Sequence, residues 1–238
     1  PFVLGLLYCL TSFTAPQEIQ NITTFFKDAD AFFAHYVEKG SIKYDKLKDD
    51  RSELQPLIEF IGKKPLKDVD FNKRKAYLIN CYNLLVINGV LERYPISTIM
   101  NTDGFFKKVQ HKIGGAMMTL DYLEYKVIFK EFTDARLHFV LVCAAKGCPP
   151  IPNFAYTPDN VSEQINTQCQ LSLDNEKFLY LDDKEKKIKL SPIFQWYKDD
   201  FLPSIPEFIN AHRTEKLPKD YELSYYEYDW RLNQWEES

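Results

Sequence analysis

An apolar run over residues 76–91 constrains the fold of this chain more than any other feature. Within the segment 70–94 this run is apolar on nearly every side of a helix, and Pro95 follows the segment. A helix that is hydrophobic all round must be covered on all sides by the rest of the protein. We therefore predict a helix over 70–94 at the centre of the core.

Two amide side chains interrupt this apolar run. Asn80 and Asn83 lie three residues apart and so share one face of the helix. A buried amide must find hydrogen-bond partners, because an unpaired one destabilises the fold. The two asparagines are therefore expected either to hold a neighbouring loop in place or to belong to a functional site.

Apolar spacing and turn residues predict the other elements. In chain order these are helices over 17–39 and 47–61, two strands within 109–120 around a pair of glycines, a short helix over 121–130, a buried strand over 137–142, a helix over 157–173, a hairpin of 178–181 with 186–190, helices that begin at Ser191 and Ser204, and a last strand within 225–230.

This order of elements contains no repeat and no long linker. It predicts an α+β fold in which residues 17–238 form a single domain, with the central buried helix packed against a small, mainly antiparallel sheet. A chain of 238 residues, of which 45% are hydrophobic, is long enough to bury such a core.

The charge balance argues against one class of partner. The chain has 30 basic and 34 acidic residues, and no predicted element carries a basic stripe. Proteins that bind nucleic acid usually show such a basic footprint. We therefore expect no nucleic acid as a partner.

The first residues resemble part of an export signal. An apolar run over 2–15 ends in small residues and is too short to span a bilayer. Residues 1–16 are interpreted as the remnant of a signal peptide, with a buried N-terminal helix or strand as the alternative. The bulky Tyr8 before Cys9 argues against a lipid anchor. We expect an extracytoplasmic (periplasmic or secreted) protein with no integral membrane segment in the mature chain, in surroundings that permit disulfides.

The segment 136–151 gathers residue types that carry chemistry. It contains His138, Cys143 and Cys148 around an apolar run. A thiol nucleophile needs a base within hydrogen-bond reach. In a straight strand, however, residues five positions apart point to opposite faces and lie roughly 16 Å apart. Cys143 and His138 can therefore act together only if the chain turns sharply within 142–145.

Two further arrangements use residues from the helices. In one, Cys81 on the central helix faces His138 on a strand, as in papain-like folds. Cys81 lies in the middle of the helix, however, where no helix-terminal dipole lowers the pKa of its thiol. Cys143 is therefore preferred as the nucleophile. Alternatively, Glu124 orients His138 while Asn80 or backbone amides donate to a developing oxyanion.

A structural interpretation competes with these enzymatic ones. Cys143 and Cys148 enclose a four-residue loop and could form a disulfide that fixes the proline-rich turn, with His138 bonded to Asn80. For a metal, His111 with His138 and Glu124 is the set that the sequence offers, and its spacing follows no known ligand motif. No metal and no cofactor are therefore expected.

Several ordered motifs between residues 42 and 233 match one family. They are Ile42-Lys43-Tyr44, Tyr77 to Asn83, Leu120-Asp121 to Glu124, Arg136 to Cys148-Pro149, and Tyr228-Asp229-Trp230 to Asn233. On these motifs the chain resembles the family known as domain of unknown function 547, which has no settled reaction.

The resemblance also carries two departures. Many members have a histidine directly after the glutamate that corresponds to Glu124, whereas this chain has Tyr125, so a mechanism that needs this second histidine is not expected here. Some plant members resemble this chain at Cys143 but have serine in place of Cys148. This implies that Cys148 is the more dispensable of the two cysteines.

Together these observations predict a thiol-dependent hydrolase or acyl transferase that acts on a peptide-like or thiol-containing small substrate. In this prediction Cys143 is the nucleophile, His138 the base, Glu124 the group that orients the base, and Asn80 the donor to the oxyanion. The alternative is a non-catalytic module whose aromatic tail and pocket hold a peptide or a glycan. The oligomeric state stays open.

Overall fold

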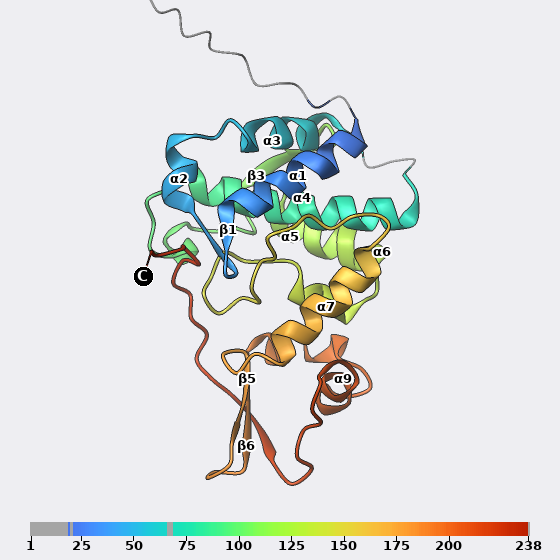
Figure 1. Ribbon diagram of the computed structural model, residues 1–238, viewed down its shortest axis with the longest axis vertical. Helices are drawn as coiled ribbons and strands as arrows, with labels where there is room; N and C mark the ends of the chain where they lie inside the picture. Colours follow the sequence, from blue (N-terminus) through green and yellow to red (C-terminus); the bar gives the residue numbers. More distant parts are fainter. Residues whose placement is uncertain (1–18, 20, 66–68, 238) are drawn as a thin grey trace, which may run out of the picture.

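The computed structural model describes residues 19, 21–65 and 69–237 (Figure 1). The segment 1–16, predicted to be a signal remnant, lies outside these residues. Among the helices of the described part, none is both long and apolar enough to cross a membrane. The chain combines helices with small, mainly antiparallel sheets, so the predicted α+β class with a single domain is confirmed.

The predicted central helix is confirmed. Helix α4 spans Phe71–Leu91, and every residue from Ala76 to its end is buried. The side chain of Asp70 caps its start by accepting a hydrogen bond from the backbone N–H of Lys73. This long helix is covered on all sides and lies at the centre of the first hydrophobic cluster of the molecule.

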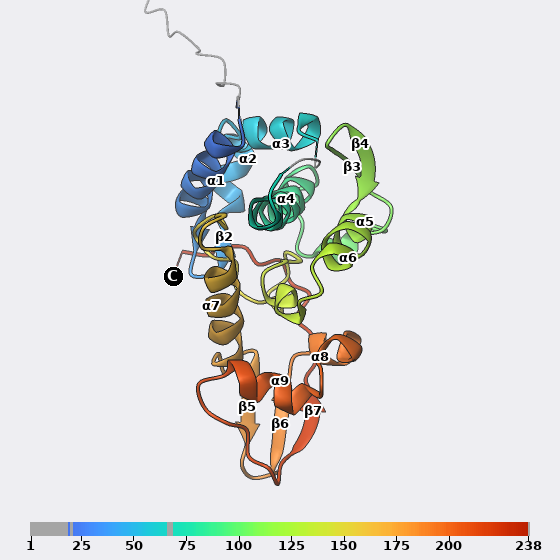
Figure 2. The same ribbon diagram turned by 90° about the vertical axis from the view of Figure 1, so that its right-hand side faces the viewer.

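Other helices surround α4. Viewed end-on in Figure 2, it lies among α1 (Ile22–Tyr36), α2 (Tyr44–Asp49), α3 (Leu54–Lys63) and the predicted hairpin of β3 (Gln110–Ile113) and β4 (Ala116–Thr119). The elements packed most closely against α4 are helices, and the small sheets lie around this helical core. A short 3-10 turn, η1 (Ile99–Asn101), precedes the hairpin.

Two predicted helices have different bounds in the structure. α1 ends at Tyr36, three residues earlier than predicted, and the short hairpin of β1 (Val37–Glu38) and β2 (Ser41–Ile42) follows it. The predicted helix 47–61 divides into α2 and α3. It divides because the side chain of Asp50 accepts a hydrogen bond from the N–H of Ser52, which favours a turn over a helix.

The predicted helix 121–130 is present and contains a π-helical turn. Its three consecutive pieces are α5 (Leu120–Tyr122), η2 (Leu123–Ile128) and α6 (Phe129–Glu131). Thr119 rather than Asp121 caps its start. Single π-helical turns are frequent at functional sites, and this one carries Glu124.

The predicted buried strand 137–142 is wrong. Residues Ala135–Phe139 form a 3-10 turn, η3, and the chain beyond it is irregular. Its backbone is held by a side chain of α4: Asn83 donates to the carbonyl oxygen of Val140 at 2.9 Å and accepts from the N–H of Val142 at 3.0 Å. Buried backbone groups need partners, and here an amide supplies them in place of a neighbouring strand.

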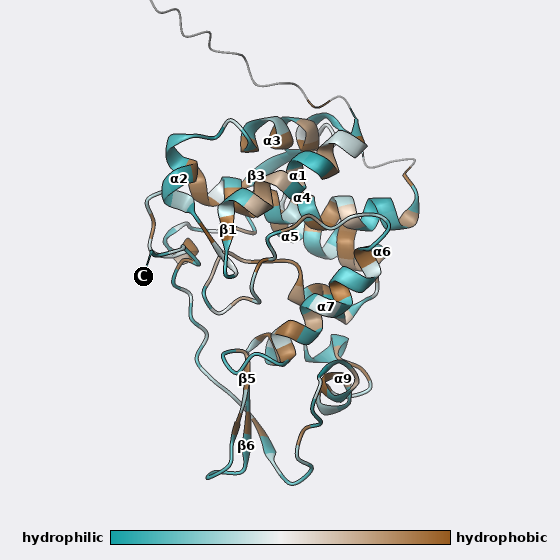
Figure 3. Cartoon of the chain, in the orientation of Figure 1, coloured by the Kyte–Doolittle hydropathy of each residue, from teal (hydrophilic) through white to brown (hydrophobic). Residues whose placement is uncertain are grey.

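A second hydrophobic cluster lies below the first in Figure 1, and hydrophobic residues are visible in both parts in Figure 3. The helices and strands of this lower part of the molecule are α7 (Val161–Leu173), β5 (Leu179–Asp182), β6 (Lys187–Leu190), α8 (Ile193–Trp196), η4 (Lys198–Asp200), α9 (Ile205–His212) and β7 (Glu222–Tyr225). The rings of Phe139, Phe194 and Phe201 pack together in its centre.

The three-stranded sheet of this part has the order β5-β6-β7. β5 and β6 form the predicted antiparallel hairpin, with Leu179 opposite Leu190, whereas β7 runs parallel to β6. The last strand ends at Tyr225, so the strand predicted within 225–230 lies earlier in the chain than expected.

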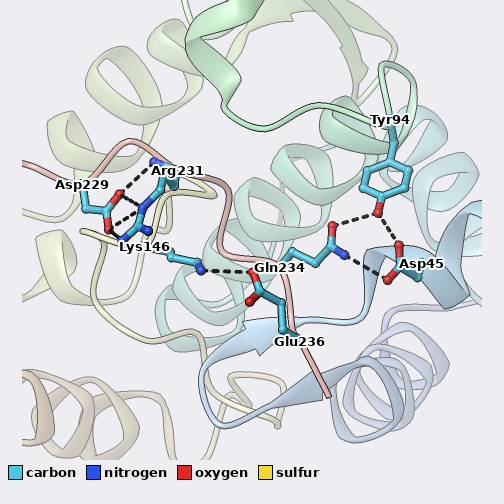
Figure 4. Close-up of polar contacts among 7 residues, drawn as sticks. All are labelled: Asp45, Tyr94, Lys146, Asp229, Arg231, Gln234 and Glu236. Atoms are coloured by element: carbon cyan, nitrogen blue, oxygen red, sulfur yellow. Dashed lines mark hydrogen bonds and ion pairs between the residues drawn. The ribbon is translucent and has the colours of Figure 1, made fainter. Parts of the chain in front are cut away.

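The chain beyond β7 returns along the molecule to the first cluster (Figure 1). Figure 4 shows its end: Gln234 bonds to Tyr94 at 2.8 Å and to Asp45 at 2.9 Å, and Lys146 pairs with Glu236 at 3.2 Å. We call residues 226–236 the C-terminal strap.

Backbone hydrogen bonds join this strap to the loop after η3. The N–H of Lys146 donates to the carbonyl of Arg231 at 2.7 Å, and the N–H of Gly147 donates to the carbonyl of Asp229 at 2.9 Å. The strap therefore lies directly beside residues 143–148.

Candidate active site

A cavity of about 440 Å³ lies where the two hydrophobic clusters meet. Three of the four predicted site residues line it, namely Glu124, His138 and Cys143. They come from the π-helical turn, from η3 and from the irregular loop that follows η3. Tertiary packing therefore brings most of the predicted set together.

His138 is enclosed by aromatic rings. Its ring stacks on Phe129 at 4.5 Å and on Tyr197 at 4.2 Å between centroids, and only 2% of its side chain is exposed. Its Nε2 lies 2.7 Å from Oδ2 of Asp200. Burial lowers the pKa of the imidazole, while the bond to this carboxylate acts in the opposite direction. His138 is therefore held rigidly and favoured as the neutral base.

The free nitrogen of this ring matters for catalysis. A carboxylate can only accept, so the proton between the two side chains is assigned to Nε2 of His138. In the part of the chain that the structure describes, Nδ1 has no hydrogen-bond partner. Its lone pair is available to take a proton.

The sharp turn that the sequence required is present. Ala144 has a φ of +59°, a left-handed conformation that few non-glycine residues adopt. With Asn83 holding the preceding residues, this turn brings Cys143 to the cavity that His138 lines. The separation expected for a straight strand therefore does not apply.

The cysteines of this loop are paired. Cys143 and Cys148 form a disulfide, one of the two states that the sequence left open. The hydroxyl of Tyr228 lies 3.1 Å from the sulfur of Cys143 and 3.2 Å from that of Cys148. The backbone N–H of Cys143 donates to the Cys148 sulfur at 2.9 Å. Both cysteines line the cavity, and the sulfur of Cys148 receives two hydrogen bonds.

Glu124 does not orient His138, contrary to the prediction. Its carboxylate accepts a hydrogen bond from the Tyr82 hydroxyl at 2.7 Å, and the carboxylate that contacts His138 is Asp200. Burial raises the pKa of Glu124 from 4.5 to about 7. The hydrogen bonds from the hydroxyls of Tyr82 and Tyr125 oppose this rise, and the nearby charge of Asp121 adds to it. Glu124 is thus an acidic group of the cavity that is separate from the His138–Asp200 pair.

Asn80 is a structural residue rather than an oxyanion donor. Its side chain donates to the carbonyl of Tyr156 at 2.8 Å and accepts from the N–H of the same residue at 3.0 Å, and it is fully buried away from the cavity lining. Both of its polar groups are occupied by the backbone, so the prediction for Asn80 is corrected. Cys81 does not line the cavity either, and burial raises the pKa of its thiol. The papain-like arrangement is therefore not formed.

The metal set considered from the sequence is not assembled. His111 lies on β3 and does not line the cavity that holds His138 and Glu124. Among the described residues, no group of three or more His, Cys, Asp or Glu side chains is arranged to hold a metal ion.

Aromatic side chains form much of the cavity wall. Trp196 and Trp230 stack at 5.8 Å, Tyr228 packs on both, and the hydroxyl of Tyr125 bonds to that of Tyr197 at 2.9 Å. Tyr125, which stands where many relatives have histidine, thus contributes a ring and a hydroxyl. These residues come from η2, α8, the turn after α8, and the C-terminal strap.

Sequence reasoning missed Asp200, the partner of His138. It lies 62 residues further along the chain, in an acidic pair after Trp196 and Tyr197. Such a pair is typical of an exposed turn, so the sequence held no specific signal for this role. Tyr228 and Trp230, by contrast, belong to the motif by which the strap resembles its family.

Comparison with known proteins supports the family resemblance. Residues 66–171 match the family model described as "Protein of unknown function, DUF547". Comparisons with curated proteins and with solved structures give no match. The matched range includes Glu124, His138 and both cysteines of the disulfide, whereas Asp200 and the strap lie outside it. This match supports the resemblance to the DUF547 family that the motifs of the chain predicted.

Proposed function

We propose that the cavity is the active site of a thiol-dependent hydrolase or acyl transferase that acts on a peptide-like or thiol-containing small substrate. The observation that carries this proposal is that Cys143 and the His138–Asp200 pair line one cavity. A nucleophile, a base, and a third group that holds the base are the parts that thiol-dependent acyl transfer requires.

The reaction begins with opening of the disulfide. A small thiol attacks the sulfur of Cys143, the S–S bond breaks, and Cys148 leaves as a thiolate. The N–H of Cys143 and the hydroxyl of Tyr228, which already donate to the Cys148 sulfur, stabilise that charge. A second small thiol then releases Cys143 and forms a disulfide with the first.

Acyl transfer follows from the free thiol. Nδ1 of His138 takes the proton of the Cys143 thiol, and the sulfur bonds to the acyl carbon of the substrate. The leaving group departs with that proton, leaving a thioester on Cys143. Water or another acceptor then takes the acyl group. Asp200 stabilises the imidazolium through its bond to Nε2.

A variant that cannot form the disulfide tests this function. Cys148→Ser leaves Cys143 as a free thiol, which should react with iodoacetamide and form a thioester with an activated acyl ester, seen as a mass increase on the peptide containing Cys143. Adding His138→Gln should slow alkylation about tenfold or more, because the base is lost. The buried thiols of Cys81 and Cys169 serve as internal controls that should not react in the folded protein. If the variant with His138→Gln is alkylated at an unchanged rate and circular dichroism confirms its fold, His138 is not the base.

The closed disulfide favours one alternative, a non-catalytic module that binds a peptide or a glycan. A disulfide removes the nucleophile, and the stacked rings of Trp196 and Trp230 provide a surface for such a ligand. The double variant Cys143→Ser/Cys148→Ser separates the two functions. Undiminished ligand binding by this variant, with no acylation of the Cys148→Ser protein, would support the binding module over the enzyme.

We also propose that the protein is extracytoplasmic. The disulfide supports this location, because disulfides persist in oxidising compartments, as does the apolar run over residues 2–15. Cell fractionation with alkylation of free thiols before lysis tests it. A cytoplasmic protein with both cysteines of the loop reduced would contradict export.

A further inference from the structure

We propose that the cavity binds a ligand carrying a protonated primary amine, with Glu124 as the acceptor of the ammonium group and the aromatic wall around it. This inference rests on the proposed function only in placing the ligand in the same cavity. It narrows the substrate class, which that function gives only as peptide-like or thiol-containing.

The charge of the cavity favours a cationic ligand. Two carboxyl groups line it, Asp121 and Glu124, and the charge of the first acts on the second. Lys107 is the cationic side chain of the lining; it is exposed, and no ion pair joins it to either carboxyl group in the described structure. His138 is favoured as the neutral form. The cavity thus holds acidic groups without matched cations.

The position of Glu124 favours a cation as its partner. The donors that act on its carboxylate are neutral, the hydroxyls of Tyr82 and Tyr125, and no cation acts on it strongly enough to lower its pKa. A buried carboxylate is stabilised when it is paired with an opposite charge. An ammonium group with three N–H donors would supply both the charge and the remaining hydrogen bonds.

The aromatic wall of the cavity favours an organic cation. Tyr125, Tyr197, Trp196, Tyr228 and Trp230 line the cavity. The faces of aromatic rings attract cations, most strongly when water is excluded. Aromatic rings beside a carboxylate favour an organic amine over a hydrated metal ion. A primary amine also satisfies the carboxylate with N–H donors, which a quaternary ammonium lacks.

Binding of a simple amine tests the inference. The affinity of n-butylammonium is measured by isothermal titration calorimetry against n-butanol, a neutral molecule of similar shape, and against tetramethylammonium. We expect n-butylammonium to bind at least about tenfold more tightly than n-butanol, as a charge-assisted hydrogen bond implies. Equal affinity for the amine and the alcohol would overturn the proposal. Equal affinity for n-butylammonium and tetramethylammonium, with both affinities unchanged in Glu124→Gln, would assign binding to the aromatic rings alone. That result would also overturn the proposal.

Variants locate the ammonium group. Glu124→Gln keeps an acceptor for Tyr82 but removes the charge, and should weaken n-butylammonium binding about tenfold. Asp121→Asn should weaken it less, because this carboxyl acts at longer range. Glu163→Gln, on the exposed face of α7, is the matched control and should leave the affinity unchanged. Retained affinity in the folded Glu124→Gln protein would contradict the assignment.

The dependence on pH gives a second measurement that needs no variant. The charged and titratable groups that surround Glu124 in this cavity are Tyr82, Lys107, Asp121, Tyr125, His138 and Tyr197. Because Glu124 is half protonated near pH 7, amine affinity should rise between pH 6 and pH 8 as its carboxyl ionises. An affinity that is flat over this range would contradict its role.

The two proposals fail separately. The double variant Cys143→Ser/Cys148→Ser should still bind n-butylammonium, since neither sulfur holds the amine. Loss of amine binding in a protein whose Cys143 still forms a thioester would overturn only this inference. Amine binding without thioester formation would overturn only the proposed reaction.

Discussion

Nε2 of His138 lies 2.7 Å from Oδ2 of Asp200, although 62 residues separate them. The histidine belongs to η3 at the end of the first cluster, and the aspartate ends η4 beside the second. The base of the candidate site and the group that holds it are therefore brought together only when the two parts of the chain pack.

Asp200→Asn should slow alkylation of Cys143 about tenfold or more in the Cys148→Ser background. The amide can donate as well as accept, so it no longer fixes the proton of His138 on Nε2, and less of the base is poised to take the thiol proton. The measurement is the rate of iodoacetamide incorporation at pH 7. Asp199→Asn, its exposed neighbour, is the control. Equal rates for both variants would show that the pair has no role in activating the thiol.

Glu124 should make the protein less stable as the pH rises. Its pKa is raised in the folded state, so the folded protein binds a proton more tightly than the unfolded one, and this stabilisation is complete below about pH 4.5 and is lost as the pH rises through about 7. A shift from 4.5 to about 7 corresponds to about 3 kcal/mol at 1.36 kcal/mol per pKa unit, an upper value.

Denaturant unfolding of wild type and Glu124→Gln at pH 5 and pH 8 measures this effect. The stability of the variant relative to wild type should increase at the higher pH, and comparing the two proteins cancels the titration of all other groups. A relative stability that does not change with pH would mean that Glu124 is ionised and well solvated in the folded protein.

Asn83→Ala should destabilise the fold by about 2–4 kcal/mol, because it leaves the buried carbonyl of Val140 and the buried N–H of Val142 without partners. It should also lower the reactivity of Cys143, since the following turn loses its support. Asn80→Ala should cost a similar amount of stability but leave this reactivity unchanged, because its partner is Tyr156. Urea unfolding and alkylation of the Cys148→Ser protein measure the two effects. Equal loss of reactivity in both variants would contradict the separate roles of the two amides.

Tyr228→Phe should slow reduction of the disulfide by dithiothreitol several-fold, about the effect of losing one hydrogen bond to a charged group. The hydroxyl that donates to the Cys148 sulfur is lost, so the leaving thiolate is less well stabilised. Tyr225→Phe, whose ring is 36% exposed, is the matched control. The time course of free thiols, measured with a chromogenic disulfide, tests the prediction. A faster or unchanged rate would mean that Tyr228 only packs against the sulfurs.

The sequence predicted well where a local pattern decides the structure. The all-round apolar run of α4 is buried as expected, and the glycine pair at 114–115 connects β3 and β4. The serine at 204 caps α9. These features depend on hydrophobic periodicity, on left-handed backbone and on capping, which are properties of neighbouring residues.

The largest error concerned residues 137–142, whose composition favours a strand. A strand needs a partner strand for its backbone groups, and here Asn83 satisfies two of them from α4. Composition could not show this. In a straight strand Cys143 and His138 would lie far apart, whereas the irregular loop places both residues on one cavity.

By itself, the sequence determined the resemblance to the DUF547 family, the α+β class, the central helix, and three of the cavity residues, Glu124, His138 and Cys143. Only the tertiary structure decided which groups meet: Asp200 with His138, Tyr82 with Glu124, and Tyr228 with the disulfide. The physical reason is that hydrophobic periodicity acts over a few residues, whereas hydrogen bonds between distant segments form only after packing has brought them within about 3 Å.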